Sequence, residues 1–116
     1  MRIEGDGPSA TIVDGSGLMR VFRVALPQIT DLVELRDLTI RNGNEASGGY
    51  GGGNEIASRT LLENVHLEGN RGNFGGAIAT PQTQGSTLTL RHCVVSTNTS
   101  TNGAGGIHRP PLLLGT

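Results

Sequence analysis

Three charged residues recur at nearly even spacing along the chain. They are Arg36, Glu63 and Arg91, and their charges alternate in sign. An arginine that shares a surface with carboxylates can act as a catalytic acid or base, when a bound cation or a second acid assists the reaction. The alternating sign favours another role, in which opposite charges on neighbouring strands attract each other by roughly 0.2–1 kcal/mol per pair. We therefore expect a charge ladder rather than a catalytic arginine.

A second polar set follows directly after the first one, at Asp37, Asn64 and His92. One carboxylate and one imidazole do not form an acid–base pair here, because two strand spacings separate them by roughly 10 Å. We expect these residues to occupy a bend of the chain.

Asp14 begins a third polar column, which continues through Asn42, Gly69 and Thr97. Hydrolysis of a glycosidic bond normally requires two carboxyl groups that flank the bond, and this column offers one. The three histidines fall at unrelated positions and lack the spacing of a metal site. The sequence thus predicts no catalytic residue, no metal ligand and no cofactor.

Short strands in an internal repeat must position these residues. Residues 33–40, 60–67 and 88–95 align without a gap. In each copy apolar residues alternate with polar ones, which indicates a strand with one buried face, and a single step of three residues marks a bend. The inward columns predict a core made of Leu35, Leu38, Ile40, Leu62, Val65, Leu67, Leu90, Cys93 and Val95.

A polar turn and a glycine corner follow each pair of strands. Glycine and asparagine adopt left-handed or tight backbone conformations that other residues resist. Asn70 and Asn98 share one column of the turn, and we expect their side-chain amides to form a ladder. The predicted corner glycines are Gly52, Gly75, Gly76, Gly105 and Gly106.

Strand, bend, strand, turn and corner every 27 or 28 residues predict an all-β fold, a parallel β-solenoid of about three to four coils. The coils are expected over residues 1–108, with an opening coil at 1–32 and repeats at 33–58, 59–85 and 86–108. Residues 109–116 contain two prolines, which stop strand pairing, and are expected to form an irregular tail.

The opening coil is the most degenerate copy. A step of one repeat length back from Ile40 reaches Ile12, so we expect Ile12 to lie beside Ile40. A second strand follows, and its residues Phe22 and Val24 are expected to point inward.

Composition agrees with a solenoid of small aliphatic residues. Only 3% of the 116 residues are aromatic and 34% are hydrophobic, while 19 are glycine. The net charge is −1 and all nine cations are arginines scattered among ten acids, so no basic face for nucleic acid is expected. Cys93 falls in an inward column and is expected to act as a small buried hydrophobic residue.

No apolar run is long enough to span a membrane, and the first residues lack the apolar region of a signal peptide. We therefore expect no membrane insertion by this segment. The absence of an obvious polar end repeat suggests a fragment of a longer protein, whose missing flanking repeats would stack coil to coil on this one.

Two motifs carry a resemblance to a known family. Leu67-Glu68-Gly69-Asn70 followed by Gly75-Gly76-Ala77-Ile78 resembles the polymorphic outer membrane protein repeat, with a degenerate second copy at Val95-Ser96-Thr97-Asn98 and Gly105-Gly106-Ile107. The opening residues 10–15 and 21–24 look like the first coil of bacterial right-handed parallel β-helix proteins. The resemblance covers roughly residues 3–108 and implies a right-handed, pectin-lyase-like β-helix in a secreted or surface-exposed bacterial protein.

The expected function is non-enzymatic. We expect a structural or adhesive segment of a bacterial surface or secreted protein, located outside the cell, whose turns meet a glycan or a host or cell-surface protein. The alternative is a fragment of a carbohydrate-active enzyme, a polysaccharide lyase or a glycoside hydrolase, with its catalytic coils elsewhere. In that case carboxylates and an arginine or lysine base would lie on other coils.

Overall fold

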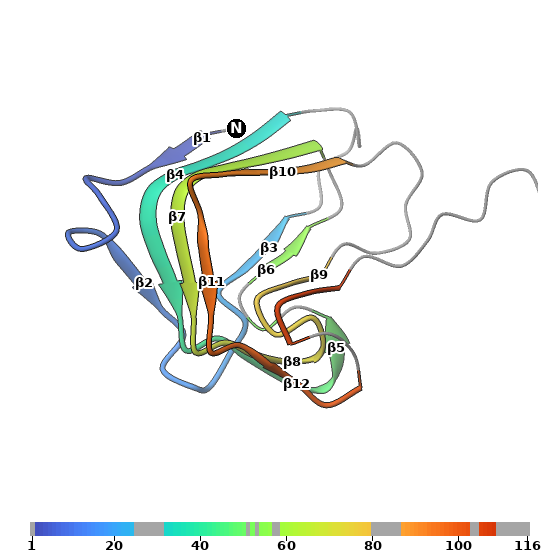
Figure 1. The fold of residues 1–116 in the computed structure, drawn as a ribbon. Helices are drawn as coiled ribbons and strands as arrows, with labels where there is room; N and C mark the ends of the chain where they lie inside the picture. The colour runs from blue at the N-terminus through green and yellow to red at the C-terminus, as the bar shows by residue number, and fades with distance from the viewer. Residues whose placement is uncertain are drawn as a thin grey trace, which may run out of the picture.

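The computed structural model describes residues 2–24, 32–50, 52, 54–56, 59–79, 87–102 and 105–108. The regular elements in these ranges are all β-strands, and every strand pair among them is parallel. The chain visits three sheets in turn and then returns to the first (Figure 1). The described part is therefore all-β with parallel sheets, and it contains no helix long and apolar enough to cross a membrane.

We call each passage around the sheets a rung; rungs 2, 3 and 4 have strands in all three sheets, and rung 1 has strands in the first and third. Rung 1 covers the described residues of 2–24, rung 2 those of 32–56, rung 3 those of 59–79 and rung 4 those of 87–108. In Figure 1 the strands of successive rungs lie side by side in each sheet.

The first sheet carries most of the core. β4 and β7 form its centre; β1 and β2 pair with β4 on one side, and β10 and β11 pair with β7 on the other. The bounds of these strands are β1 Arg2–Glu4, β2 Ile12–Asp14, β4 Leu32–Arg41, β7 Arg59–Glu68, β10 Thr87–Arg91 and β11 Val94–Ser96.

The second sheet has strands from rungs 2, 3 and 4, and the third sheet has one from every rung. The second sheet has the order β12-β8-β5, and the third has the order β13-β9-β6-β3. Their bounds are β5 Asn44–Tyr50, β8 Arg71–Phe74 and β12 Thr99–Ser100, then β3 Phe22–Val24, β6 Asn54–Ile56, β9 Ile78–Ala79 and β13 Ile107–His108.

The register of the first sheet follows the predicted repeat across rungs 2, 3 and 4. Leu62 pairs with Leu35 on one side and with Leu90 on the other. Inward side chains of neighbouring rungs therefore stack on one another, and a slip of one residue would turn them all outward. The expected core residues of rungs 2 and 3 are at most 1% exposed, namely Leu35, Leu38, Ile40, Leu62, Val65 and Leu67.

Rung 4 is less buried than the sequence predicts. Leu90 and Cys93 are only partly buried, although both pack against the core, and the Cys93 thiol lies 3.3 Å from the carbonyl oxygen of Leu62. Val95 departs from the expected core, since it is 37% exposed. It pairs with Leu67 on one side, and among the described strands none pairs with β11 on the other.

In rungs 2, 3 and 4 the chain bends within the first sheet at one residue with a left-handed backbone, inside β4 and β7 and between β10 and β11. The φ angles of Asp37, Asn64 and His92 are 57°, 53° and 52°. This conformation costs most L-residues about 1–2 kcal/mol, and Asp, Asn and His are the types that tolerate it best. The left-handed residue interrupts the side-chain alternation, which explains the step of three. Asn64 Nδ2 donates to Asp37 Oδ1 at 2.9 Å and joins two successive bends.

A ladder of asparagine amides joins the rungs inside the next turn. Asn70 is fully buried, and its Nδ2 donates to Asn98 Oδ1 at 2.9 Å and to the Ile40 carbonyl oxygen at 3.1 Å. Its Oδ1 accepts the backbone N–H of Gly43 at 2.9 Å. The expected ladder of Asn70 and Asn98 is therefore present, and it also satisfies the backbone of the adjacent rung.

The glycine corners stack across rungs 2 to 4. The backbone N–H of Gly52 donates to the Gly75 carbonyl oxygen, and that of Ala77 donates to the carbonyl oxygens of Gly105 and Gly106. The corner is too tight for side chains at Gly76, because a Cβ atom there would lie 2.3 Å from the carbonyl oxygen of Gly105.

The register of the opening rung differs from the expectation by one residue. β2 pairs Ile12 with Thr39 and Val13 with Ile40, so the predicted pairing of Ile12 with Ile40 is wrong. Ile12 lies on the outer face and is 44% exposed. The step from β2 to β4 equals the step from β4 to β7, which is the shorter of the two repeat lengths in the sequence.

Rung 1 also begins with a strand that the repeat pattern does not reveal. In β1, Ile3 pairs with Leu35, and a longer connection over residues 5–11 joins this strand to β2. Phe22 is partly buried against the core as expected. The side chain of Val24 and the expected tail at 109–116 lie outside the part of the chain that the structure describes.

Candidate functional site

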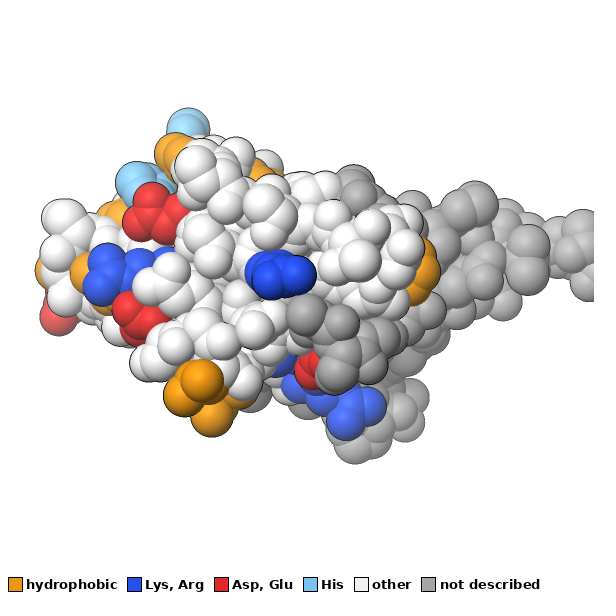
Figure 2. Space-filling view, turned by 90° about the horizontal axis from the view of Figure 1, so that it is seen from below, with side chains coloured by type: hydrophobic (Ala, Val, Ile, Leu, Met, Phe, Trp, Pro, Cys, Tyr) orange, Lys and Arg blue, Asp and Glu red, His pale blue; other side chains and the backbone are white. Residues whose placement is uncertain are grey.

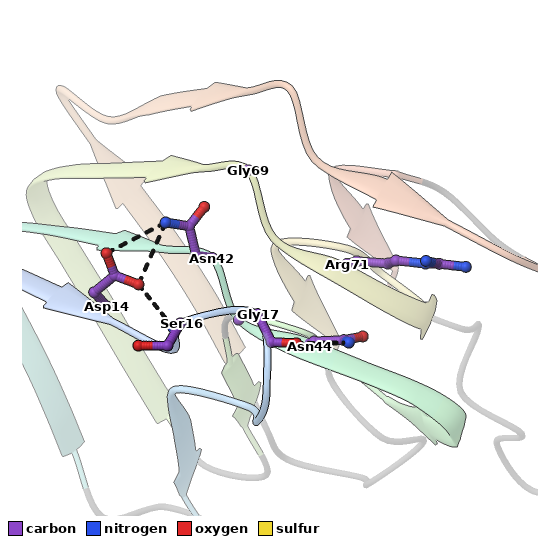
Figure 3. A pocket seen from close by; sticks show the side chains of 8 residues that line it. Asp14, Ser16, Gly17, Asn42, Asn44, Gly69 and Arg71 are labelled. Carbon is purple, nitrogen blue, oxygen red and sulfur yellow. Dashed lines mark hydrogen bonds between the residues drawn. The ribbon is translucent and has the colours of Figure 1, made fainter.

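A polar hollow lies at the corner between the first and second sheets. Its volume is about 430 Å³, and residues of rungs 1, 2 and 3 line it (Figure 3). We call it the Asp14 hollow. Its lining residues are Asp14, Ser16, Gly17, Asn42, Gly43, Asn44, Gly69 and Arg71.

Left-handed residues create this corner. Ser16, Asn42 and Gly69 have φ angles of 57°, 55° and 66°, and the chain turns out of the first sheet near these residues in each of the three rungs. The Asn42 side chain projects from the corner toward Asp14 in Figure 3. A Cβ atom on Gly69 would lie 3.1 Å from Asn42 Oδ1, so the missing side chain leaves room beside this amide.

Asp14 is the acidic group of the hollow, and both of its oxygens already accept hydrogen bonds. Oδ1 accepts the backbone N–H of Ser16 at 2.7 Å, and Oδ2 accepts Arg41 Nε at 2.9 Å. Asn42 Nδ2 lies 3.3 Å from Oδ1 and 3.2 Å from Oδ2. Arg41 and Asn42 belong to rung 2, so this carboxylate ties two rungs together.

These bonds favour the ionised carboxylate. The backbone N–H of Ser16, followed by the Arg41 side chain and the Asn42 amide, holds the pKa of Asp14 below its ordinary value of 3.8. A carboxylate with a lowered pKa is a weak base, and it carries no proton to donate near neutral pH. Asp14 is therefore suited to accepting hydrogen bonds and unsuited to general acid or base chemistry.

Asn44 forms the floor of the hollow. Its backbone N–H donates to the Met19 carbonyl oxygen at 2.9 Å, and its Nδ2 donates to the Gly17 carbonyl oxygen at 3.0 Å. Both bonds hold the loop of rung 1 against rung 2. The Asn44 Oδ1 atom is buried and accepts no hydrogen bond from the described residues.

Arg71 supplies the positive charge at the far side of the hollow. It begins β8, its side chain is exposed, and it extends away from Asp14 in Figure 3. Within the described ranges it forms no ion pair. The surrounding surface, which contains β5, β8 and β12, is mostly white in Figure 2, and so is poor in charged and hydrophobic side chains.

The charge ladder lies on the first sheet, away from this hollow. Arg36 Nη1 pairs with Glu63, and Arg36 Nε donates to Glu34 Oε2 at 3.0 Å. Arg91 lies beside Glu63 in the register of β10 and β7. Among the described residues, however, these two side chains form no ion pair. The predicted ladder therefore has one ion pair, between Arg36 and Glu63, and one open position, at Arg91, where no ion pair with a described residue forms.

The ladder and its neighbours do not gather carboxylates. Asp37 hydrogen-bonds to Asn64 at the bend, and His92 is exposed at the same bend of rung 4. Within the described ranges no three His, Cys, Asp or Glu side chains come close enough to hold a metal ion.

Sequence reasoning found part of the hollow and missed the rest. It placed Asp14, Asn42, Gly69 and Thr97 in one column that lacks a second carboxylate; this placement of Asp14 is wrong, because β2 pairs Asp14 with Arg41 rather than with Asn42. It did not single out Asn44 or Arg71. The run Asn42-Gly43-Asn44 was the available signal, because asparagine and glycine are residues that favour turns.

No protein-family model matches this chain, and neither a curated protein nor a solved structure shows significant similarity to it.

Proposed function

We propose that this chain is a non-enzymatic segment of a right-handed parallel β-helix, which serves as a scaffold in a bacterial surface or secreted protein and binds a glycan at the Asp14 hollow. The observation that carries the binding role is the state of Asp14, a carboxylate that is fixed by three donors and exposed at a polar corner.

The regular stacking of rungs supports the β-helix. Rungs 2, 3 and 4 visit the three parallel sheets in the same order, and the first sheet keeps its register across these rungs. Connections between parallel strands of one sheet are right-handed in about 98% of cases, which supports the proposed hand.

The chemistry of the hollow supports binding rather than catalysis. Asp14 is the carboxylate among its lining residues, and its pKa is lowered. Cleavage of a glycosidic bond would require a second acid or a base with a raised pKa.

A glycan fits the remaining groups. The Asn42 amide and the Ser16 hydroxyl can both donate to and accept from sugar hydroxyls. Arg71 can donate to ring or carboxylate oxygens. Leu18 and Met19, which follow the hollow's Gly17, are 80% and 63% exposed and offer apolar surface for the C–H face of a sugar ring.

The resemblance of Gly75-Gly76-Ala77-Ile78 and its preceding turn to the polymorphic outer membrane protein repeat supports the surface location. It is the basis for placing the partner, a glycan of the cell envelope or of a host, outside the cell.

The test is a screen of the purified chain against neutral and acidic oligosaccharides, followed by NMR titration of the strongest ligand. We expect chemical-shift changes centred on Asn42 and Arg71, and at least about tenfold weaker binding by Asn42→Ala and Arg71→Ala. Asn102→Ala is the matched control, because Asn102 is an exposed amide outside the hollow that bonds to Asn73.

Two results would count against the proposal. Binding that is unchanged in both hollow variants would move the glycan site elsewhere. Release of unsaturated products or new reducing ends from pectic or alginate polymers, with or without Ca²⁺, would favour the carbohydrate-active enzyme instead.

A further inference from the structure

The two end rungs of the chain present complementary edges. In the first sheet β1 and β2 pair only with β4 among the described strands, and β10 and β11 pair only with β7. In the third sheet β3 and β13 are the end strands. We propose that rung 4 of one molecule stacks on rung 1 of a second copy, so that the chain assembles head to tail.

The charge column is the first argument for a second copy. Glu4 pairs in register with Arg36, Arg36 with Glu63, and Glu63 with Arg91. The outward column therefore reads acid, base, acid, base across the four described rungs. If β10 pairs with β1 of the next copy in the same register, Arg91 lies beside Glu4 and the alternation continues without interruption.

The open position of the ladder agrees with this pairing. Arg91 is exposed and forms no ion pair with a described residue, and the Glu4 side chain is 47% exposed although it pairs with Arg2. Opposite charges directly across a ladder attract by roughly 0.2–1 kcal/mol, and like charges repel by a similar amount. The pairing therefore selects one register and one polarity.

The inward columns continue in the same register. Ile3 lies in the column of Leu35, Leu62 and Leu90, so the next copy places its Ile3 on Leu90. Both side chains are only partly buried in the single molecule and both touch the core. Stacking would cover them in the way that rungs 2 and 3 cover each other.

The second half of the sheet adds another apolar contact. Val13 lies in the column of Ile40, Leu67 and Val95, and Ile12 lies in the column of Thr39, His66 and Val94. A second copy therefore brings Val13 onto Val95 inside and Ile12 onto Val94 outside. In the single chain Ile12 is 44%, Val94 47% and Val95 37% exposed.

The third sheet follows the same rule. Ile107 shares a column with Ile78, Asn54 and Phe22, so the next copy places Phe22 on Ile107. Both are partly buried and pack against the core. All these contacts join rung 4 of one molecule to rung 1 of another, so the interface is heterologous. Such an interface produces open filaments rather than closed dimers.

A charge-swap experiment on the full 116-residue chain tests the assembly. We expect the weight-average mass, measured by sedimentation or light scattering, to rise with protein concentration. Arg91→Glu alone and Glu4→Arg alone each place like charges at the junction, and each should weaken association at least about fivefold. An equimolar mixture of the two variants restores opposite charges at the junction and should recover association, as should the double variant.

Arg59→Glu is the matched control, because Arg59 is an exposed arginine of the interior strand β7 and lies at neither end. It should associate like the unmodified chain, and circular dichroism should show the same fold for all variants. A mass that stays monomeric at all concentrations would overturn the proposal. So would two single variants that lose association and do not recover it on mixing.

Discussion

The Asn70 side chain bridges two rungs at once: its Nδ2 donates to Asn98 Oδ1 in rung 4 and to the Ile40 carbonyl oxygen in rung 2. The same side chain is fully buried and accepts the Gly43 N–H. It therefore joins rungs 2, 3 and 4 through hydrogen bonds of a buried side chain.

Asn70→Ala should lower the free energy of unfolding by about 3 kcal/mol. The substitution leaves the buried backbone N–H of Gly43 without its Asn70 acceptor, at a cost of about 1–3 kcal/mol, and it also removes the hydrogen bonds from Asn70 to the Ile40 carbonyl oxygen and to Asn98. Urea denaturation should show a lower midpoint with an unchanged slope. Asn98→Ala, at the more open end of the ladder, should have a smaller effect. Equal effects would mean that burial of Asn70 is not what stabilises the turn.

The bend at His92 can be used to measure the cost of the left-handed backbone. His92 has a φ of 52° and is exposed, so few side-chain contacts complicate its replacement. His92→Gly should stabilise the chain by about 0.5–1 kcal/mol, and His92→Val should destabilise it by about 1–2 kcal/mol, because glycine accepts this φ and a β-branched residue does not. Thermal unfolding of both variants provides the comparison. Similar melting temperatures would show that the bend relaxes.

Asp14 should make stability depend on pH in the acid range. Its pKa is lower in the folded chain than its ordinary value of 3.8, so its stabilising contribution is fully present above pH 3.8. That contribution is lost as the pH falls through the lower, folded-state value. Urea midpoints measured from pH 6 downward should therefore decrease less steeply for Asp14→Asn than for the unmodified chain. Parallel decreases would place the acid sensitivity in other carboxylates.

The Arg36–Glu63 contact should be worth more than the open position at Arg91. Arg36 is 23% exposed and Glu63 31% exposed, and Arg36 also bonds to Glu34. A double-mutant cycle with Arg36→Ala and Glu63→Ala should yield a coupling energy of about 0.5–1 kcal/mol. The same cycle for Arg91 and Glu63 in the monomeric chain should yield a value near zero. A large second coupling would show that the Arg91 pair forms in solution.

Alanine substitutions at Leu67 and Val95 should destabilise the chain by different amounts, because the two residues differ in burial although both belong to one inward column. Leu67→Ala should cost about 2–5 kcal/mol, because Leu67 is fully buried and its removal leaves a cavity. Val95→Ala should cost less than about 1 kcal/mol in the monomer, because an exposed side chain leaves no cavity. Denaturation midpoints compare the two directly, and a large loss at Val95 would indicate that the end of rung 4 is covered in solution.

Much of the fold could be read from the sequence because it depends on local periodicity. The alternation around Leu35 and Leu62 defines the buried face, and the step of three at Asp37 and Asn64 predicts the bend. The amide ladder from Asn70 to Asn98 was predictable for the same reason. In stacked rungs each residue lies beside the equivalent residue of the next rung. A repeat in the sequence therefore also predicts which residues are in contact.

Only the tertiary structure decided the features that depend on the exact length of each rung and on what covers it. Because β2 pairs one position away from the predicted register, Val13 rather than Ile12 lies beside Ile40, and Asp14 lies beside Arg41. The exposure of Val95 follows from its place on the end rung. The Asp14 hollow combines Asp14, Asn44 and Arg71 from three rungs. Asn44 and Arg71 pair in register one repeat apart, but their approach to Asp14 depends on the path of the corner.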